Sequence, residues 1–380
     1  MYMSKLPHIG SSIFTIMSQM ANEYNAINLS QGFPNFPIDE RLKNSLAKWA
    51  KSEVHQYIPM AGLPPLLEKI TLLTLNSYQK IVNPLTEILI TAGATEGIFA
   101  TIQALVNQNE EVIILDPSYD CYETPILLCN AKPIRINLND DFTPNWNTIG
   151  NAMNSNTKMI IINNPHNPTG KVWTINDYLQ LEKLLDLFPN IIVLSDEVYE
   201  YITFENKHIS VHHREKLKER SVIISSFGKS FHITGWKIGY LIAPEHLMVE
   251  IKKVHQFLVF SVNSIAQYAI NDYLDIIHVD ELSTFYQQKR DYFRNLLQET
   301  KFLLLPCEGT YFQLVSYKQL SLEKDIDFTK KLVIEYGVSA IPLSPFFADN
   351  KQTHCIRLCF AKEENTLFSA YERLKKLPYL

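Results

Sequence analysis

The sequence feature that most constrains the fold is a series of short apolar segments that alternate along the chain with helical patterns. These segments are rich in β-branched residues and cover positions 112–115, 159–163, 191–195 and 221–224. Each is almost continuously apolar rather than apolar at every second position, which is typical of strands buried on both faces. Their alternation with helices predicts an α/β fold with a mainly parallel sheet that is sandwiched by helices.

The pattern changes toward the end of the chain, where short strands and helices follow one another at 311–315, 328–336 and 355–359. We expect this part to form a smaller α+β domain that is completed by the N-terminal arm. The predicted division is a large domain over 36–275, with 1–35 and 276–380 forming the arm and the small domain. A chain of 380 residues is long enough for two such units.

The composition excludes several classes of protein. The formal net charge is −5 and the chain has no long basic run, so nothing favours binding to nucleic acid. No apolar segment reaches the length that spans a bilayer, and residues 1–20 lack the pattern of a signal peptide. The five cysteines are an odd number without metal-type spacing. These observations predict a cytoplasmic protein without a membrane segment or a metal site.

Lys229 is unusual because it follows directly on an apolar strand, just after the tight turn that Gly228 permits. The ammonium group of such a lysine must find a partner or lose its charge through desolvation. A lysine with a lowered pKa is a nucleophile that forms a Schiff base with an aldehyde. Ser226 and Lys237, on either side, suit a phosphate monoester, which indicates pyridoxal 5′-phosphate. For Lys229 alone, a solvated loop residue is the alternative.

Polar residues recur where predicted strands end, and ligands bind at the carboxyl ends of strands in open parallel sheets. Gly93, Ala94 and Thr95 lie between a strand and a helix, so that their N–H groups could hold an anion. A plain turn is the alternative for this triplet. Asn167 stands among prolines and suits either a hydrogen bond to a phenolic oxygen or a structural turn.

Two charged residues occur in apolar strands and need an explanation. Asp196 closes the strand at 191–195, where a carboxylate requires a positive partner such as a pyridinium N–H, or else caps a helix. Arg357 lies inside the apolar strand at 355–359. Its side chain either reaches the surface or anchors a carboxylate through two hydrogen bonds.

Taken together, these segments resemble the class I and II aminotransferases, the pyridoxal-phosphate enzymes of fold type I. The motifs occur in the order of that family: TAGATEG, DPSYDCY, NNPHNPTG, SDEVYE and SFGKSFHITGWKIGY. The resemblance extends from SQGFPNFP to CIRLCFA, and it is strongest to the subgroup of methionine and kynurenine aminotransferases (glutamine transaminase K). Thr95 and Ser261 resemble bacterial methionine-type members, whereas kynurenine aminotransferases have tyrosine and histidine there.

The resemblance implies a cofactor-binding role for the large domain. Lys229 would carry the cofactor as a Schiff base, Asp196 would hold the pyridine nitrogen, and Tyr199 with Asn167 would bind the phenolic oxygen. The ring would stack on Tyr119. The phosphate would be held by Gly93, Ala94, Thr95, Ser226, Lys237 and a tyrosine from a second subunit, matching Tyr57.

The resemblance also implies where a substrate binds. Gly32, Asn167 and Arg357 match the site of the substrate carboxylate, while Phe14 and Phe260 match aromatic residues of the side-chain pocket. The segments expected to line that pocket contain no arginine or lysine: 13–17, 57–60 and 258–263. This composition favours methionine, glutamine and aromatic amino acids over aspartate, because a buried unpaired carboxylate is costly.

The implied reaction moves the amino group of such an L-amino acid to a 2-oxo acid, in a homodimer with shared active sites. Lys229, Asp196 and Tyr199 would be the catalytic residues. A cysteine-conjugate β-lyase that uses the same cofactor is an alternative which only product analysis separates. An effector-binding module is disfavoured, because about thirty residues before the motifs are too few for a DNA-binding domain. A structural protein is disfavoured by the presence of Lys229, Asp196 and Arg357 together.

Overall fold

The computed structural model describes residues 4–7 and 9–380. In this part of the chain, the central feature is a seven-stranded sheet whose strands run parallel except β8, which is antiparallel to both of its neighbours. Its strands, in spatial order, are β2 (Ile88–Thr91), β8 (Gly239–Ile242), β7 (Ser221–Ser226), β6 (Ile192–Asp196), β5 (Thr157–Asn163), β3 (Glu111–Asp116) and β4 (Lys132–Asn137).

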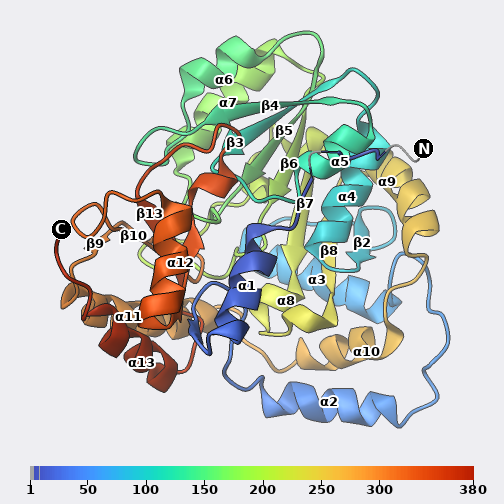
Figure 1. The fold of residues 1–380 in the computed structure, drawn as a ribbon. Coiled ribbons are helices and arrows are strands. Elements are labelled where there is room, and N and C mark those ends of the chain that lie inside the picture. The colour runs from blue at the N-terminus through green and yellow to red at the C-terminus, as the bar shows by residue number, and fades with distance from the viewer. Residues whose placement is uncertain (1–3, 8) are drawn as a thin grey trace.

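Helices cover both faces of this sheet (Figure 1) because successive apolar strand residues point to opposite sides. In β3, Val112 and Ile114 pack into one core, and Ile113 and Leu115 into another. The first face is covered by α4 (Ala94–Leu105), α5 (Glu123–Leu128) and α9 (Glu245–Leu258). The second is covered by α3 (Pro64–Tyr78), α6 (Trp146–Ala152), α7 (Ile175–Leu187) and α10 (Ser264–Tyr273), with α2 (Glu40–Ala50) packed on α10.

Local signals in the sequence explain where several helices begin and end. A capping box between Thr174 and Asp177 starts α7, and Pro64 opens α3 where its missing N–H costs nothing. Gly337 ends α12 (Asp325–Tyr336) in the left-handed conformation, with φ of 66°.

A second, smaller sheet lies beside the first and is antiparallel. Its strands, in spatial order, are β12 (Ile341–Pro342), β13 (Cys355–Cys359), β10 (Phe312–Ser316) and β9 (Leu303–Leu304). The helices of this region are α11 (Glu281–Gln298), α12 and α13 (Glu364–Leu374), and α1 (Ile13–Glu23) lies next to α12 (Figure 1). The N-terminal strand β1 (Ile27–Asn28) pairs with β11 (Val338–Ser339), so the first residues join the last third of the chain.

The predicted architecture of a mainly parallel sheet between helices, with a smaller α+β part, is therefore observed. The domain boundaries at 35/36 and 275/276 stay a prediction. Within residues 4–7 and 9–380, no helix is both long and apolar enough to cross a membrane.

Candidate active site

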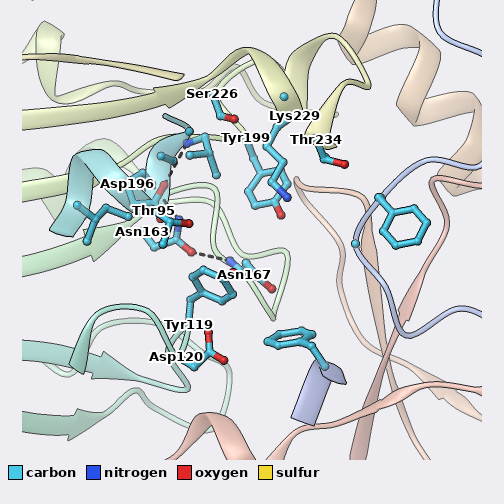
Figure 2. A pocket seen from close by; sticks show the side chains of 18 of the residues that line it. Thr95, Tyr119, Asp120, Asn163, Asn167, Asp196, Tyr199, Ser226, Lys229 and Thr234 are labelled. Carbon is cyan, nitrogen blue, oxygen red and sulfur yellow. Dashed lines mark hydrogen bonds between the residues drawn. The ribbon is translucent and has the colours of Figure 1, made fainter. Parts of the chain in front are cut away.

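A cavity of about 380 Å³ lies at the carboxyl ends of the central strands and is closed from the other side by α1 and the smaller sheet. Thirteen of the residues singled out from the sequence line it: Phe14, Gly32, Gly93, Ala94, Thr95, Tyr119, Asn167, Asp196, Tyr199, Ser226, Lys229, Lys237 and Arg357. In Figure 2, Lys229 extends beside Tyr199, with Tyr119 and Asp120 across the cavity. The fold thus gathers residues that are up to 343 positions apart in the chain (357 − 14).

One end of the cavity has the chemistry of an anion site. Gly93 links β2 to α4 with φ of 78°, and the N–H groups of the first turn of α4 have no partners within the helix. A Cβ atom at Gly93 would lie 3.1 Å from Nζ of Lys237, so a larger residue would displace that amine. Thr95 and Ser226 line the same end with hydroxyl groups. An amine, two hydroxyls and a helix N-terminus together suit a phosphate group.

Lys229 lies in α8 (Phe227–Ser230), the short helix that directly follows β7. Its Nζ atom is 5.7 Å from the ring centroid of Tyr199 and 5.8 Å from that of Tyr311. Burial lowers the pKa of the Lys229 amine to about 8, and the charge of Arg357 acts in the same direction. The amine is therefore much closer to its nucleophilic, neutral form at physiological pH than an ordinary lysine.

Asp196 ends β6 and is only 4% exposed. The hydroxyl of Tyr122 donates a 2.6 Å hydrogen bond to its Oδ2 atom, and the N–H of Val198 donates to Oδ1. Burial raises the pKa of Asp196 to about 6, while the hydrogen bond from Tyr122 opposes this rise. A positively charged N–H donor in the cavity would restore the carboxylate form. The sequence reasoning did not assign Tyr122, although it lies in the DPSYDCY motif.

Asn167 is held by a neighbour that the sequence reasoning also missed. Asn163, at the end of β5, accepts a 2.8 Å hydrogen bond from the N–H of Asn167 and donates one to the carbonyl of Asp196. Figure 2 shows Asn163 between these two residues. The ends of β5 and β6 are thereby tied together at the floor of the cavity.

Arg357 does not reach the surface, because its side chain is 1% exposed and faces the cavity. Its guanidinium lies 3.8 Å from the ring centroid of Phe312 and donates to the Asn167 side chain at 2.7 Å and the Ser30 carbonyl at 3.0 Å. Its buried Nε atom has no partner in the described part of the chain. A stacked guanidinium with an unused donor is suited to a carboxylate.

The opposite end of the cavity is aromatic and partly open. The ring of Phe14 contacts that of Tyr119 edge-on, with 6.0 Å between centroids, and lies 5.2 Å from the Arg357 guanidinium. Asp120 is exposed at the rim next to Tyr119 (Figure 2). This carboxylate was not among the sequence predictions, because a rim position is set only by the packing of α1 against the loop after β3.

Tyr57 and Phe260 are the two predicted residues that do not line the cavity of a single chain. They pack against each other edge-on at 5.2 Å and are 81% and 47% exposed. Their predicted contribution to the site of a second subunit stays a prediction.

The cavity therefore contains a lysine of lowered pKa, a buried carboxylate, an anion site and an aromatic wall. Sequence comparison is decisive at this point: the model of the family described as aminotransferase class I and II matches residues 24–374. The chain belongs to this family. It is an aminotransferase, as the motifs predicted.

Individual relatives agree with this assignment. The chain is 45% identical over 378 residues to the methionine aminotransferase of Escherichia coli K12, a match that covers 98% of each chain. It is 32% identical to a kynurenine–oxoglutarate transaminase of Dictyostelium discoideum, covering 97% of this chain and 94% of the relative. Among solved structures, an Escherichia coli protein identified as a methionine aminotransferase superposes with a TM-score of 0.96 at 45% identity, covering 99% of this chain and all of the other. The fold type I architecture is thus confirmed.

Proposed function

We propose that this aminotransferase uses pyridoxal 5′-phosphate and transfers the amino group of L-amino acids with neutral side chains, methionine foremost, to a 2-oxo acid. The observation that carries the substrate class is the charge distribution of the cavity. Its lining cations, among the described residues, are Lys229, Lys237 and Arg357. Lys229 and Lys237 would bind the cofactor and Arg357 the α-carboxylate of the substrate, so none of these cations remains to pair with a second carboxylate.

The residues of the chain fit this cofactor. Pyridoxal 5′-phosphate, when bound, supplies an electron sink for the bond that breaks at the substrate Cα. Lys237, Thr95, Ser226 and the N-terminus of α4 would hold its phosphate. Asp196 would hold its ring nitrogen, which provides the positive N–H that this buried carboxylate needs.

Two residues would carry the proton transfer and the orientation. The Lys229 amine, with its pKa lowered to about 8, can accept the proton from the substrate Cα and return it as a general acid. Arg357 would bind the substrate carboxylate and so fix which bond at Cα faces the cofactor ring. Tyr119 would cover the ring on the open side.

The side-chain end of the cavity supports neutral substrates. Phe14 offers an aromatic surface, and Asp120 places a negative charge at the rim. Burying a side chain of the size of methionine stabilises it by about 1.5–3 kcal/mol. A glutamate or aspartate side chain would instead face Asp120, a group of like charge.

We further propose that the working enzyme is a homodimer. Tyr57 and Phe260 form an exposed aromatic pair, and the family resemblance assigns both to the cavity of the other subunit. A second copy would then complete the side-chain end and the phosphate site.

A panel of amino donors tests the substrate class. We expect kcat/KM for methionine or phenylalanine to exceed that for aspartate by at least about tenfold, the discrimination typical of an apolar pocket. The measurement uses a fixed 2-oxo acid and quantifies the amino acid formed from it. Equal or better use of aspartate would show that a cation reaches the pocket and would refute the proposal.

A further inference from the structure

Tyr311 makes a contact between the two sheets that none of the motif residues explains. It immediately precedes β10, is 0% exposed and lies behind the cavity rather than in its lining. Its hydroxyl donates a 2.6 Å hydrogen bond to the backbone carbonyl of Gly32, 279 positions away in the sequence. Gly32 itself lines the cavity on the side of Arg357. Tyr311 therefore controls the orientation of a peptide group at the substrate site.

Other contacts also hold the segment from Ser30 to Gly32 in place and leave its backbone little conformational freedom. The side-chain oxygen of Asn28 accepts hydrogen bonds from the N–H groups of Ser30 and Gln31. The Ser30 carbonyl accepts from Arg357 at 3.0 Å. A Cβ atom on Gly32 would lie only 2.7 Å from the Phe312 ring. The bond from Tyr311 directs the Gly32 carbonyl toward the aromatic cluster and away from the lining of the cavity.

The same tyrosine also contacts the catalytic side of the cavity. Its ring meets that of Tyr199 edge-on, with centroids 5.2 Å apart and planes at 89°. Nζ of Lys229 lies 5.8 Å from its ring centroid, within the range of a cation–π interaction. Burial raises the pKa of Tyr199, while the Arg357 charge opposes the rise. Tyr311 thus contacts Gly32 at the proposed substrate-carboxylate site and the ring of Tyr199, and it lies close to the amine of Lys229.

We propose that Tyr311 is a positioning residue for transamination, which couples the substrate-carboxylate site to Tyr199 and Lys229. By binding the Gly32 carbonyl, its hydroxyl keeps a partial negative charge out of the site where the α-carboxylate of either substrate binds. Its ring packs edge-on against Tyr199 and so supports that side chain. The first effect depends on the hydroxyl group, whereas the packing against Tyr199 depends on the ring.

The variant Tyr311→Phe tests this directly, because it removes the hydroxyl and keeps the ring. We expect KM for the amino acid and for the 2-oxo acid to rise about two- to tenfold, the loss of one hydrogen bond, with a smaller change in kcat. The affinity of the holoenzyme for 3-phenylpropionate, a carboxylate without an amino group, should fall by the same factor in calorimetry. The pH midpoint of the absorbance of the bound cofactor should stay unchanged, because the variant keeps the ring contact with Tyr199.

Tyr286→Phe is the matched control. Tyr286 is also 0% exposed, packs 5.7 Å from the Tyr311 ring, and has a buried hydroxyl without a partner in the described part of the chain. Its variant should leave KM, 3-phenylpropionate affinity and the absorbance midpoint unchanged. A Tyr311→Phe enzyme with wild-type KM values and wild-type affinity for 3-phenylpropionate, whatever its melting temperature, would overturn the proposal. Binding of 3-phenylpropionate reports on Tyr311 without turnover. Failure of the wild-type enzyme to bind it would count against the proposed substrate class, whereas equal affinity in both enzymes would count against the role of Tyr311.

Discussion

The two ends of the cavity are built differently. The cofactor end is formed by the strand ends of one sheet and the helix starts that follow them: Thr95 lies in the first turn of α4, Asp196 closes β6, and Lys229 follows β7. Its buried carboxylate and the strand ends around it are fixed by hydrogen bonds within the chain, such as those from Tyr122 to Asp196 and from Asn163 to the β6 carbonyl. The side-chain end is formed by α1, a loop and an exposed rim.

We therefore expect the reaction to depend on the cofactor end and the substrate specificity to depend on the side-chain end. Lys229, Asp196 and the N-terminus of α4 come from one chain, so the cofactor end should tolerate changes at the rim, whereas its phosphate site, as proposed, also takes Tyr57 from a second copy. The side-chain end combines elements from three parts of the sequence and, as proposed, from a second copy. Loops and termini that are positioned by a rigid sheet are where substrate preference commonly varies.

The largest expected effect comes from the cofactor end. Lys229→Ala should lower kcat by at least about 10³-fold, because it removes the proposed general base and acid of the reaction. The variant should keep some cofactor through Asp196 and the phosphate site. Reduction of the wild-type holoenzyme with borohydride, followed by peptide mapping, should find the label on Lys229. Lys216→Ala, which removes an exposed lysine paired with Asp186, is the control and should be fully active.

The next effect tests whether a second chain completes the cavity. A mixture of Lys229→Ala and Tyr57→Ala subunits should recover about a quarter of wild-type activity, because half of randomly paired dimers carry one intact site. A mixture of Lys229→Ala with Asp196→Ala should recover nothing, since both residues lie in the cavity of one chain. Recovery in neither mixture, or full activity of a monomer in sedimentation, would contradict the shared site.

A pH effect of about tenfold is expected for the uptake of pyridoxal 5′-phosphate by the cofactor-free protein. Only the neutral amine attacks the aldehyde, and the pKa of Lys229 is lowered to about 8. The neutral fraction therefore rises from about a tenth at pH 7 to about nine tenths at pH 9. Stopped-flow absorbance should show the rate constant rising across this interval and levelling off above it. A rate that is still rising steeply at pH 10 would indicate an ordinary lysine.

The smallest expected effect concerns the rim. Asp120→Asn should raise the ratio of kcat/KM for glutamate to that for methionine about fivefold, because it removes one like charge in a solvated site. The ratio isolates the side-chain effect, since both donors share the same α-carboxylate. Asp140→Asn is the control: Asp140 is 98% exposed, pairs with Lys351 and lies outside the cavity lining. An unchanged ratio would assign the preference to Phe14 and the partner's aromatic residues alone.

The sequence by itself determined the order of strands and helices and the residues at the strand ends. Lys229, Asp196 and Thr95 could be placed because continuous apolar runs mark buried strands, and parallel strands bring their carboxyl ends to one edge. Glycine and proline marked the turns between them. These signals are local in the sequence, and the structure has strands and turns at the predicted positions.

Only the tertiary structure decided how distant segments meet. Arg357 could have reached the surface or faced a ligand, and its stacking on Phe312 and bond to Asn167 resolved this. The pairing of Tyr122 with Asp196 and that of Tyr311 with Gly32 left no trace in the sequence pattern. The physical reason is that periodicity specifies which face of an element is buried. The atom that a side chain meets depends instead on how two separate sheets and α1 pack together.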